Sequence, residues 1–204
     1  MDRGARNASR RPLKSRSTAW AKMAARGLLA AGLGPNSISF LGILVALFGS
    51  AAMLIEPAPS PWFLAAALCV QLRLAANLLD GMVAIEGGRG GPTGAIWNEF
   101  PDRIEDSALL VAAGYATPYP WLGWLAALLA AVCAYVRLLG GSLGQDQDFG
   151  GPMAKPHRMA ALTLGCLAAL FSAGALDIAL ALIAAGTALT IALRVRRLAR
   201  AMHA

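Results

Sequence analysis

Two neighbouring apolar stretches of the sequence carry polar residues at the spacing of one helix face. The first stretch contains Asn77 and Asp80, and the second contains Asn98 and Asp102. Residues three or four apart share a face of a helix, so each pair forms a polar stripe. Carboxylate and amide oxygens are ligands for hard cations such as Mg²⁺, which is commonly bound by a few carboxylates together with substrate phosphates. The two stripes therefore predict a metal site for a phosphate-bearing substrate.

These stretches also allow a structural interpretation, an internal network of hydrogen bonds and ion pairs that joins two helices. Ionisable groups inside apolar stretches are costly and usually face a protein interior or an aqueous cavity. We favour the network for Glu105, and for Glu99 with Arg103, because residues four apart on a helix can pair. For the two stripes we favour a site.

The composition predicts which elements position these residues. Hydrophobic residues make up 57% of the 204 positions and charged residues only 14%, whereas an ordinary soluble domain has roughly 25% charged residues. The apolar residues fall in long blocks, each close to the ~20 residues that cross a bilayer as a helix. The three cysteines each lie inside such a block and are predicted to be unpaired.

We therefore predict an all-α integral membrane protein with six transmembrane helices and an N-terminal interfacial amphipathic helix. The predicted spans cover residues 38–55, 62–85, 94–116, 121–139, 159–173 and 176–193. The corresponding domains are a disordered basic tail at 1–17, the interfacial helix at 18–34, the six-helix transmembrane domain at 35–194, and a basic C-terminal tail at 195–204.

The distribution of basic residues predicts the orientation of the chain. Eight of the eighteen basic residues precede the first predicted span and four follow the last. The connections that carry Arg89 and Lys155 fall on the same side as both termini. Short cytoplasmic segments are enriched in Lys and Arg, so both termini are expected in the cytoplasm, with the chain in a bacterial inner membrane. The net charge of +7 is thereby explained without a nucleic-acid partner.

The two stripes and the residues between them resemble the CDP-alcohol phosphotransferase family. The family pattern is D-x2-D-G-x2-A-R-x8-G-x3-D-x3-D, across the second and third of six spans. Every spacing fits, and the matching positions here are Asn77, Asp80, Gly81, Ala84, Ile85, Gly94, Asn98 and Asp102. Pro35 and Asn36 also resemble the entry to the first span of the family.

Three positions depart from the family pattern. Asn77 and Asn98 replace two of its four aspartates, and Ile85 replaces its arginine. An asparagine keeps an oxygen ligand but loses a full negative charge, and hard cations depend on the charge of their ligands. Weaker metal binding is therefore expected, with one or two ions of Mg²⁺ or Mn²⁺.

The resemblance implies transfer of a phosphatidyl or phospho-alcohol group from a CDP-alcohol to an acceptor hydroxyl, with release of CMP, in phospholipid biosynthesis. CDP-diacylglycerol is the expected donor, because a lipid donor suits a site within the bilayer. Asp80 is the expected anchoring ligand, and Asp102 is expected to act as ligand and general base. Gly81, Ala84 and Gly94, with Asp80, are expected to border the CDP moiety. A homodimer is expected from the family.

Basic residues near the start of the predicted fifth span suggest how an acceptor is bound. Lys155 and Arg158 can bind the phosphate of an acceptor, or they can simply belong to a basic cytoplasmic loop. His157, between them, is expected to lie in the interface. Arg137, near the end of the predicted fourth span, is expected to extend towards the interface, with the cavity as the alternative.

Two other functions remain open from the sequence. The asparagines and Ile85 motivate a catalytically weakened member that binds a CDP-lipid without turnover, which a test of metal-dependent CMP release would distinguish. Carboxylates inside spans also occur in ion-coupled transporters, but here they gather towards one side of the membrane. Ion flux in liposomes would identify a transporter.

Overall fold

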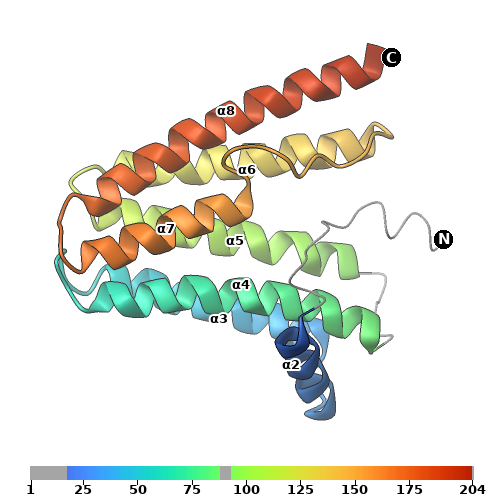
Figure 1. Ribbon diagram of the computed structural model, residues 1–204, viewed down its shortest axis with the longest axis horizontal. Helices are drawn as coiled ribbons and strands as arrows, with labels where there is room; N and C mark the ends of the chain where they lie inside the picture. Colours follow the sequence, from blue (N-terminus) through green and yellow to red (C-terminus); the bar gives the residue numbers. More distant parts are fainter. Residues whose placement is uncertain (1–17, 88–92, 204) are drawn as a thin grey trace.

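The computed structural model describes residues 18–87 and 93–203, apart from the side chains of Glu86 and Asn98. Within these residues the chain is all-helical, with no strand. The helices are α2 (Ala19–Ala30), α3 (Pro35–Met53), α4 (Trp62–Glu86), α5 (Gly94–Tyr115), α6 (Pro120–Ser142), α7 (Lys155–Ala169) and α8 (Ala175–His203). Figure 1 shows α3 to α8 running alongside one another, with α2 across one end of the bundle.

The helix boundaries follow local backbone chemistry. Gly32 adopts a positive φ of 77° after α2, a conformation that glycine reaches at little cost. Proline occupies the first turn of α3, α6 and α7, where its missing N–H is unpaired in any helix. These turns separate helices that the apolar pattern alone would run together.

Four helices are long and apolar enough to cross a membrane: α3, α4, α6 and α8. They make the chain a multi-pass membrane protein. The two remaining predicted spans correspond to α5, which carries several charges, and α7, which has only 15 residues. The count of six spans therefore stays a prediction.

The bundle is held by close packing of small residues. A Cβ on Gly114 of α5 would stand 2.7 Å from Gly123 Cα of α6, and a Cβ on Gly49 of α3 would stand 2.6 Å from Cys69 Cβ of α4. Helices in membranes associate largely through such close contacts, since lipid offers no hydrophobic driving force between them. The packing fixes α5 against α6 and α3 against α4.

Helix α2 packs one face against α4 at the end of the bundle. Ala21 and Ala25 are fully buried against a cluster that includes Leu78 and Val83 of α4. Trp20 and Met23, on another face of α2, are exposed. Helix α2 lies within the segment 18–34 for which an interfacial amphipathic helix is expected, and both its amphipathic character and its place at a membrane interface remain predictions.

The last helix is longer than the predicted span. Helix α8 continues to His203, so the segment predicted as a basic C-terminal tail is helical through residue 203. No proline or glycine interrupts residues 193–203, and a helix does not have to end where its apolar sequence ends. The disordered tail predicted for residues 1–17 and the connection with Arg89 lie outside the described residues.

Candidate functional site

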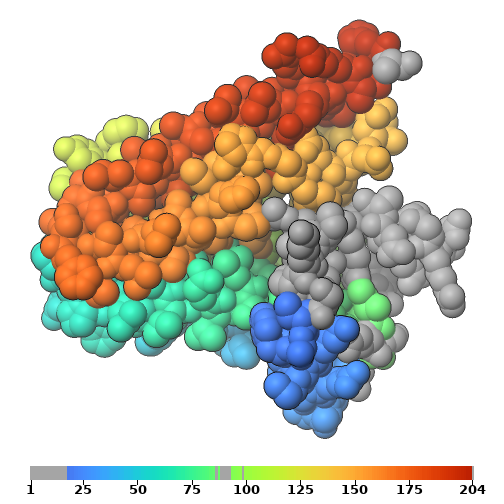
Figure 2. Space-filling view, viewed as in Figure 1, coloured from blue at the N-terminus to red at the C-terminus, as the bar shows by residue number. Residues whose placement is uncertain are grey.

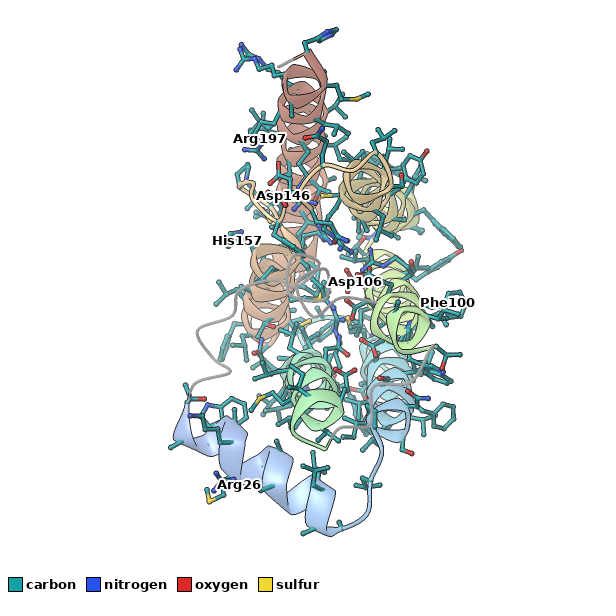
Figure 3. The ribbon with its side chains drawn as sticks, turned by 90° about the vertical axis from the view of Figure 1, so that its right-hand side faces the viewer. Arg26, Phe100, Asp106, Asp146, His157 and Arg197 are labelled. Atoms are coloured by element: carbon teal, nitrogen blue, oxygen red, sulfur yellow. The ribbon has the colours of Figure 1, made fainter. Side chains whose placement is uncertain are left out.

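The polar residues of α4 and α5 meet inside the bundle, towards the end where α2 crosses. Figure 3 looks onto this end and places Asp106 among the helices, with His157 on the outside. Asp80, Glu105 and Asp106 are all buried. The predicted facing of the two stripes is therefore what the helix packing produces.

Asp80 is a buried carboxylate with a free oxygen. Its side chain is 7% exposed, and its Oδ2 accepts a hydrogen bond of 2.7 Å from Ser39 Oγ on α3. Its Oδ1 has no hydrogen-bond partner among the described residues. Leaving a buried charged acceptor unpaired costs about 1–3 kcal/mol or more. The Oδ1 atom of Asp80 is therefore available to bind a ligand.

Asn77 acts as a hydrogen-bond donor within the site. Its Nδ2 donates to Asp102 Oδ1 at 2.5 Å and to Glu105 Oε2 at 3.0 Å. The amide nitrogen of Asn77 therefore points at two carboxylates and holds Asp102 in place. Asn98 lies one helical turn before Asp102 on α5, but its side chain is outside the described residues.

Lys155 and Arg158 turn inwards from the start of α7. Lys155 forms an ion pair with Asp102. Arg158 is 3% exposed, lies 3.3 Å from Asp106 Oδ2 through its Nη2, and donates from Nη1 to the carbonyl of Met153 at 3.1 Å. Both predicted acceptor-binding residues therefore belong to the polar site, rather than to an outward-facing loop.

Arg73 is the residue that the sequence analysis missed. It lies on α4, is fully buried, and places its Nη1 2.9 Å from Glu105 Oε2 and 3.8 Å from Asp102 Oδ1. It also pairs with Asp106. Arg73 lies four residues before Asn77, on the same helix face, and this spacing was the signal that could have identified it.

The expected pairing of Glu99 with Arg103 is wrong. Glu99 Oε2 lies 2.5 Å from Arg137 Nη2 on α6, while Arg103 lies beside Asp102 at 3.5 Å. Arg137 is buried and also bonds Gln147, so it does not extend towards the interface. The network predicted for Glu105 is present, because that carboxylate bonds Arg73 and Asn77.

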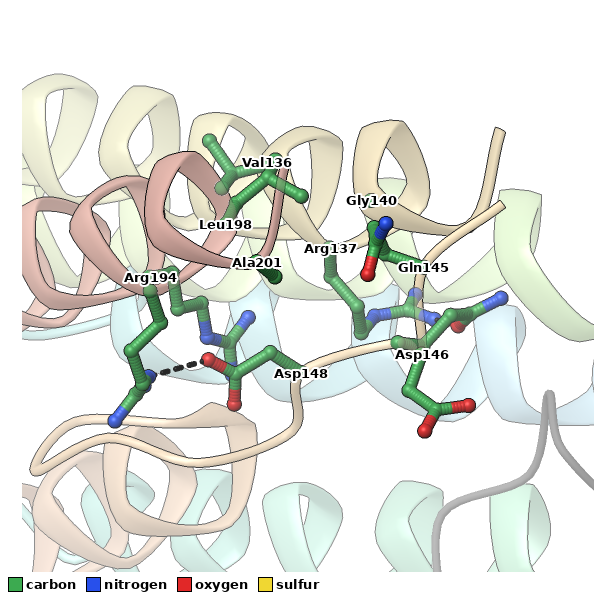
Figure 4. A pocket seen from close by; sticks show the side chains of 11 residues that line it. Val136, Arg137, Gly140, Gln145, Asp146, Asp148, Arg194, Leu198 and Ala201 are labelled. Carbon is green, nitrogen blue, oxygen red and sulfur yellow. Dashed lines mark hydrogen bonds and ion pairs between the residues drawn. The ribbon is translucent and has the colours of Figure 1, made fainter. Parts of the chain in front are cut away.

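A cavity of about 400 Å³ adjoins the site between the ends of α6 and α8 and the connection that leads to α7 (Figure 4). Arg137, Arg194 and Arg197 are among its lining residues. Arg194 is buried and donates to the carbonyls of Gly150 and Cys133 at 2.9 and 3.0 Å, and so holds the connection against the bundle. Arg137 joins this cavity to α5 through Glu99.

The small residues of the motif line the open end of the site. Gly81 and Ala84 on α4 and Gly94 on α5 are partly buried. No atom of the described residues lies within 4 Å of the place where a Cβ of Gly94 would stand. These positions leave room beside the backbone, but the arrangement does not itself identify what fills it.

Comparison with known proteins identifies the family. A phosphatidylinositol phosphate synthase of Corynebacterium glutamicum is 30% identical over 169 residues, which are 78% of this chain and 75% of that protein. The chain belongs to the CDP-alcohol phosphotransferase family. The phosphatidylinositol phosphate synthase of Mycolicibacterium smegmatis is 28% identical over 148 residues. The match covers 69% of this chain, and the chain spans only 64% of the length of that relative.

Solved structures share the fold of this CDP-alcohol phosphotransferase. The phosphatidylinositol phosphate synthase of Mycobacterium tuberculosis in complex with manganese and citrate has a TM-score of 0.74 at 24% identity, covering 87% of this chain and 88% of that chain. The same protein with CDP-DAG bound also has a TM-score of 0.74, and covers 87% and 92% of the two chains. No model of a protein family matches the sequence.

The residues present fit one metal ion of the kind expected in a CDP-alcohol phosphotransferase. Among the described residues, no three side chains of His, Cys, Asp or Glu are grouped to hold a metal. Asp80 offers an unpartnered buried oxygen, and Asp102 of α5 accepts from Asn77, which lies three residues before Asp80 on α4. Mg²⁺ is often bound by one or two carboxylates and substrate phosphates. This donor set suffices for one such ion.

Proposed function

We propose that the chain transfers a phosphatidyl group from CDP-diacylglycerol to an acceptor hydroxyl and releases CMP, as a step of phospholipid biosynthesis. The observation that carries this proposal is the buried, unpartnered oxygen of Asp80 on α4, with Asp102 of α5 held by Asn77 three residues before Asp80. Asp80 and Asp102 stand at positions of the family motif. Two relatives of the chain are phosphatidylinositol phosphate synthases, and a solved structural neighbour has CDP-DAG bound. A site of this kind within a lipid bilayer suits a lipid donor.

Asp80 and Asp102 would hold a Mg²⁺ or Mn²⁺ ion, with Asn98 as a further ligand proposed from the sequence. Such an ion, when bound, neutralises negative charge on the phosphate oxygens of the donor. A solved structural neighbour contains manganese. Asn77, which the sequence predicted as a ligand, instead donates to Asp102, so we assign it the role of orienting that carboxylate.

Asp102 would act as the general base of the transfer. It takes the proton of the acceptor hydroxyl while the acceptor oxygen forms a bond to the phosphorus of the phosphatidyl group. The bond from that phosphorus to the CMP oxygen breaks, and CMP leaves with the electron pair. A positioned base contributes about 10²–10⁴ in rate. The contacts with Asn77 and Lys155 fix the orientation of Asp102 before the substrates bind.

The small residues of the motif would border the donor. Gly81 and Ala84 of α4 are small and only partly buried, and Gly94 of α5 has no described atom within 4 Å of the place of a Cβ, which suits a CDP moiety lying against these helices. No cation stands at position 85 to contact its phosphates, because the family arginine is Ile85 here.

Lys155 and Arg158 would bind the phosphate of a phosphorylated acceptor. They approach the site from α7, on the side of Asp102 that also leads towards the arginine-lined cavity. Arginine and lysine are the usual partners of phosphate groups in proteins. The names of the curated relatives support a phosphorylated polyol as acceptor.

We also propose six spans, both termini in the cytoplasm of a bacterial inner membrane, and a homodimer. Helix α5 can cross a membrane because Glu105 and Asp106 are turned inwards and paired, while Ile96 and Phe100 are exposed on its outer surface. Helix α2, with exposed Trp20 and Met23, would then lie in the cytoplasmic interface.

CMP release by the purified protein in nanodiscs tests this function. The assay supplies CDP-diacylglycerol with a free polyol or its phosphate ester, with Mn²⁺ or with chelator. We expect metal-dependent release that is lost in Asp80→Ala and retained in Glu56→Gln, a carboxylate at the opposite end of α3. Binding of CDP-diacylglycerol without release would instead support the weakened-enzyme alternative, which the pairing of Asp102 with Lys155 favours.

A further inference from the structure

The carboxylates of α5 already have internal cations. Arg73 contacts Glu105 at 2.9 Å and Asp102 at 3.8 Å, and it pairs with Asp106. Arg158 lies 3.3 Å from Asp106 on its other side. These carboxylates and the two arginines come from three helices, and all except Asp102 are buried. Arg73 and Arg158 are therefore buried within the helix bundle and are not surface counter-ions.

A guanidinium and a metal ion compete for the same oxygens. Arginine stays charged under all conditions that a protein tolerates and binds carboxylates through a rigid fork of N–H donors. Each carboxylate oxygen that accepts from Arg73 has less charge to offer a metal, and the fixed positive charge repels a divalent ion nearby. Asn77 adds two further N–H donations, to Asp102 and to Glu105. The region between Asp102 and Glu105 is therefore occupied by the N–H groups of Arg73 and Asn77.

Asp80 differs from these carboxylates in its surroundings. Its Oδ2 accepts only a neutral hydroxyl, from Ser39, and its Oδ1 has no partner among the described residues. It is 7% exposed, so bulk water does not satisfy that oxygen. Glu105 Oε1 also has no partner among the described residues, but Glu105 Oε2 is already paired with Arg73. Asp80 forms no ion pair with a described cation, so its charge is the one that remains free for a metal ion.

We propose that the site holds a single divalent ion, bound by Asp80 with Asp102, and that the Arg73 guanidinium is a permanent cation which takes the place of a second ion between Asp102 and Glu105. This inference rests on the proposed function of the site. The chain has asparagine at positions 77 and 98, where the family has aspartate. In this arrangement the positive charge of Arg73 balances the negative charge of Asp102 without a second metal ion. Arg73 is a positioning residue in this arrangement, because it acts on the site through Asp102 and Glu105.

Mn²⁺ binding to the full chain in nanodiscs containing CDP-diacylglycerol tests the proposal without requiring turnover. We expect one Mn²⁺ per chain by titration, with an electron paramagnetic resonance spectrum free of coupling between two ions. Asn77→Asp alone should still bind one ion, because Arg73 remains. The triple variant Arg73→Leu, Asn77→Asp, Glu105→Gln, which removes the arginine with one of its partners, should bind two coupled ions. Arg196→Met, at an exposed arginine of α8, is the matched control and should bind one.

Each outcome has a distinct meaning. Two ions in the unchanged chain, or in Asn77→Asp, would overturn the role of Arg73 and leave the proposed function standing. No bound ion in the unchanged chain would overturn the metal-dependent function as well. If the triple variant does not fold, the stoichiometries of the unchanged chain and of Asn77→Asp still decide the proposal, because both retain the buried ion pairs.

Discussion

At the residue scale, the contacts of the site converge on Asp102. Asn77 and Lys155 bind its Oδ1, Arg73 lies 3.8 Å from the same oxygen, and Arg103 lies 3.5 Å from Oδ2. A carboxylate held from several directions keeps one orientation, which a general base requires. Asn77 therefore helps to orient Asp102, a role that could not be predicted from its replacement of a family aspartate.

Replacing Asp102 with asparagine should abolish transfer while leaving the fold intact. The amide cannot accept the proton of the acceptor hydroxyl, so we expect a loss of about 10²–10⁴ in rate. The measurement is the initial rate of CMP release, with the elution profile in detergent as the check on folding. Glu56→Gln is the control for loss of a carboxylate outside the site. Full activity of the Asp102 variant would refute the base role.

Replacing Arg73 with methionine should destabilise the bundle. Methionine keeps an unbranched side chain but leaves Glu105 and Asp106 without their shared cation, and removing one partner from a buried ion pair costs about 3–5 kcal/mol. The free energy of unfolding in mixed detergent and SDS micelles measures the effect. The exposed Arg196→Met control should change it by about 0.5 kcal/mol or less. An equally small change for Arg73→Met would contradict the assigned network.

At the scale of the elements, α5 carries Asp102, the carboxylate that we propose as the base, and is positioned by close helix contacts. Gly114 of α5 meets Gly123 of α6 with no space between their backbones. The position of Asp102 relative to Asp80 therefore depends on packing more than 2 turns of helix away, since Gly114 follows Asp102 by 12 residues.

Substituting Gly114 with alanine should force α5 and α6 apart. The added Cβ would stand 2.7 Å from Gly123 Cα and 2.9 Å from the carbonyl oxygen of Pro120, both of them backbone atoms. Overpacking of this kind costs about 1–3 kcal/mol. Unfolding in mixed micelles measures the cost, and CMP release reports the displacement of Asp102. Gly27→Ala, in α2 with no described atom within 4 Å of the new Cβ, should not destabilise; equal effects of both variants would argue against the packing account.

Sequence spacing predicted which residues share a helix face, and tertiary packing decided the rest. The facing of Asn77 and Asp102, which form a hydrogen bond, followed from motif spacing and a short connection between antiparallel helices. The partners Ser39 of α3 and Arg137 of α6 did not, because they are distant in sequence from the residues that they bind. Spacing along the helix predicted Arg103 as the partner of Glu99. In the folded bundle the ion pair is formed with Arg137 of α6 instead.

At the scale of the whole molecule, polar chemistry is confined to one end of an apolar bundle. The end of α4 and the start of α5, which carry Asp80 and Asp102, lie towards the end crossed by α2, whereas the turn between α7 and α8 lies at the opposite end (Figure 1). Figure 2 shows α2 and the C-terminal part of α8 projecting from the molecule towards that polar end. Within the described residues, basic side chains lie on α2, at the start of α7 and on the last part of α8, which the orientation predicted from charge places in the cytoplasm.

Cysteine labelling tests this orientation. Ser142 at the end of α6 and Ser172 in the turn between α7 and α8 are both exposed, and serine to cysteine is a small change. The native cysteines are buried, so they should give little background. An impermeant maleimide should label Ser172→Cys in spheroplasts and Ser142→Cys only in inverted vesicles. Labelling of both variants from one side would refute the proposed topology.

The central claim is that this chain forms a new phospholipid through Asp80 and Asp102. The most direct test is mass spectrometry of the lipids in nanodiscs that contain the protein, CDP-diacylglycerol, Mn²⁺ and a phosphorylated polyol. The account predicts one phosphatidyl-acceptor molecule for each CMP released, and neither product from Asp80→Ala or Asp102→Asn. CMP without a new phospholipid, or the same yield from both variants, would contradict it.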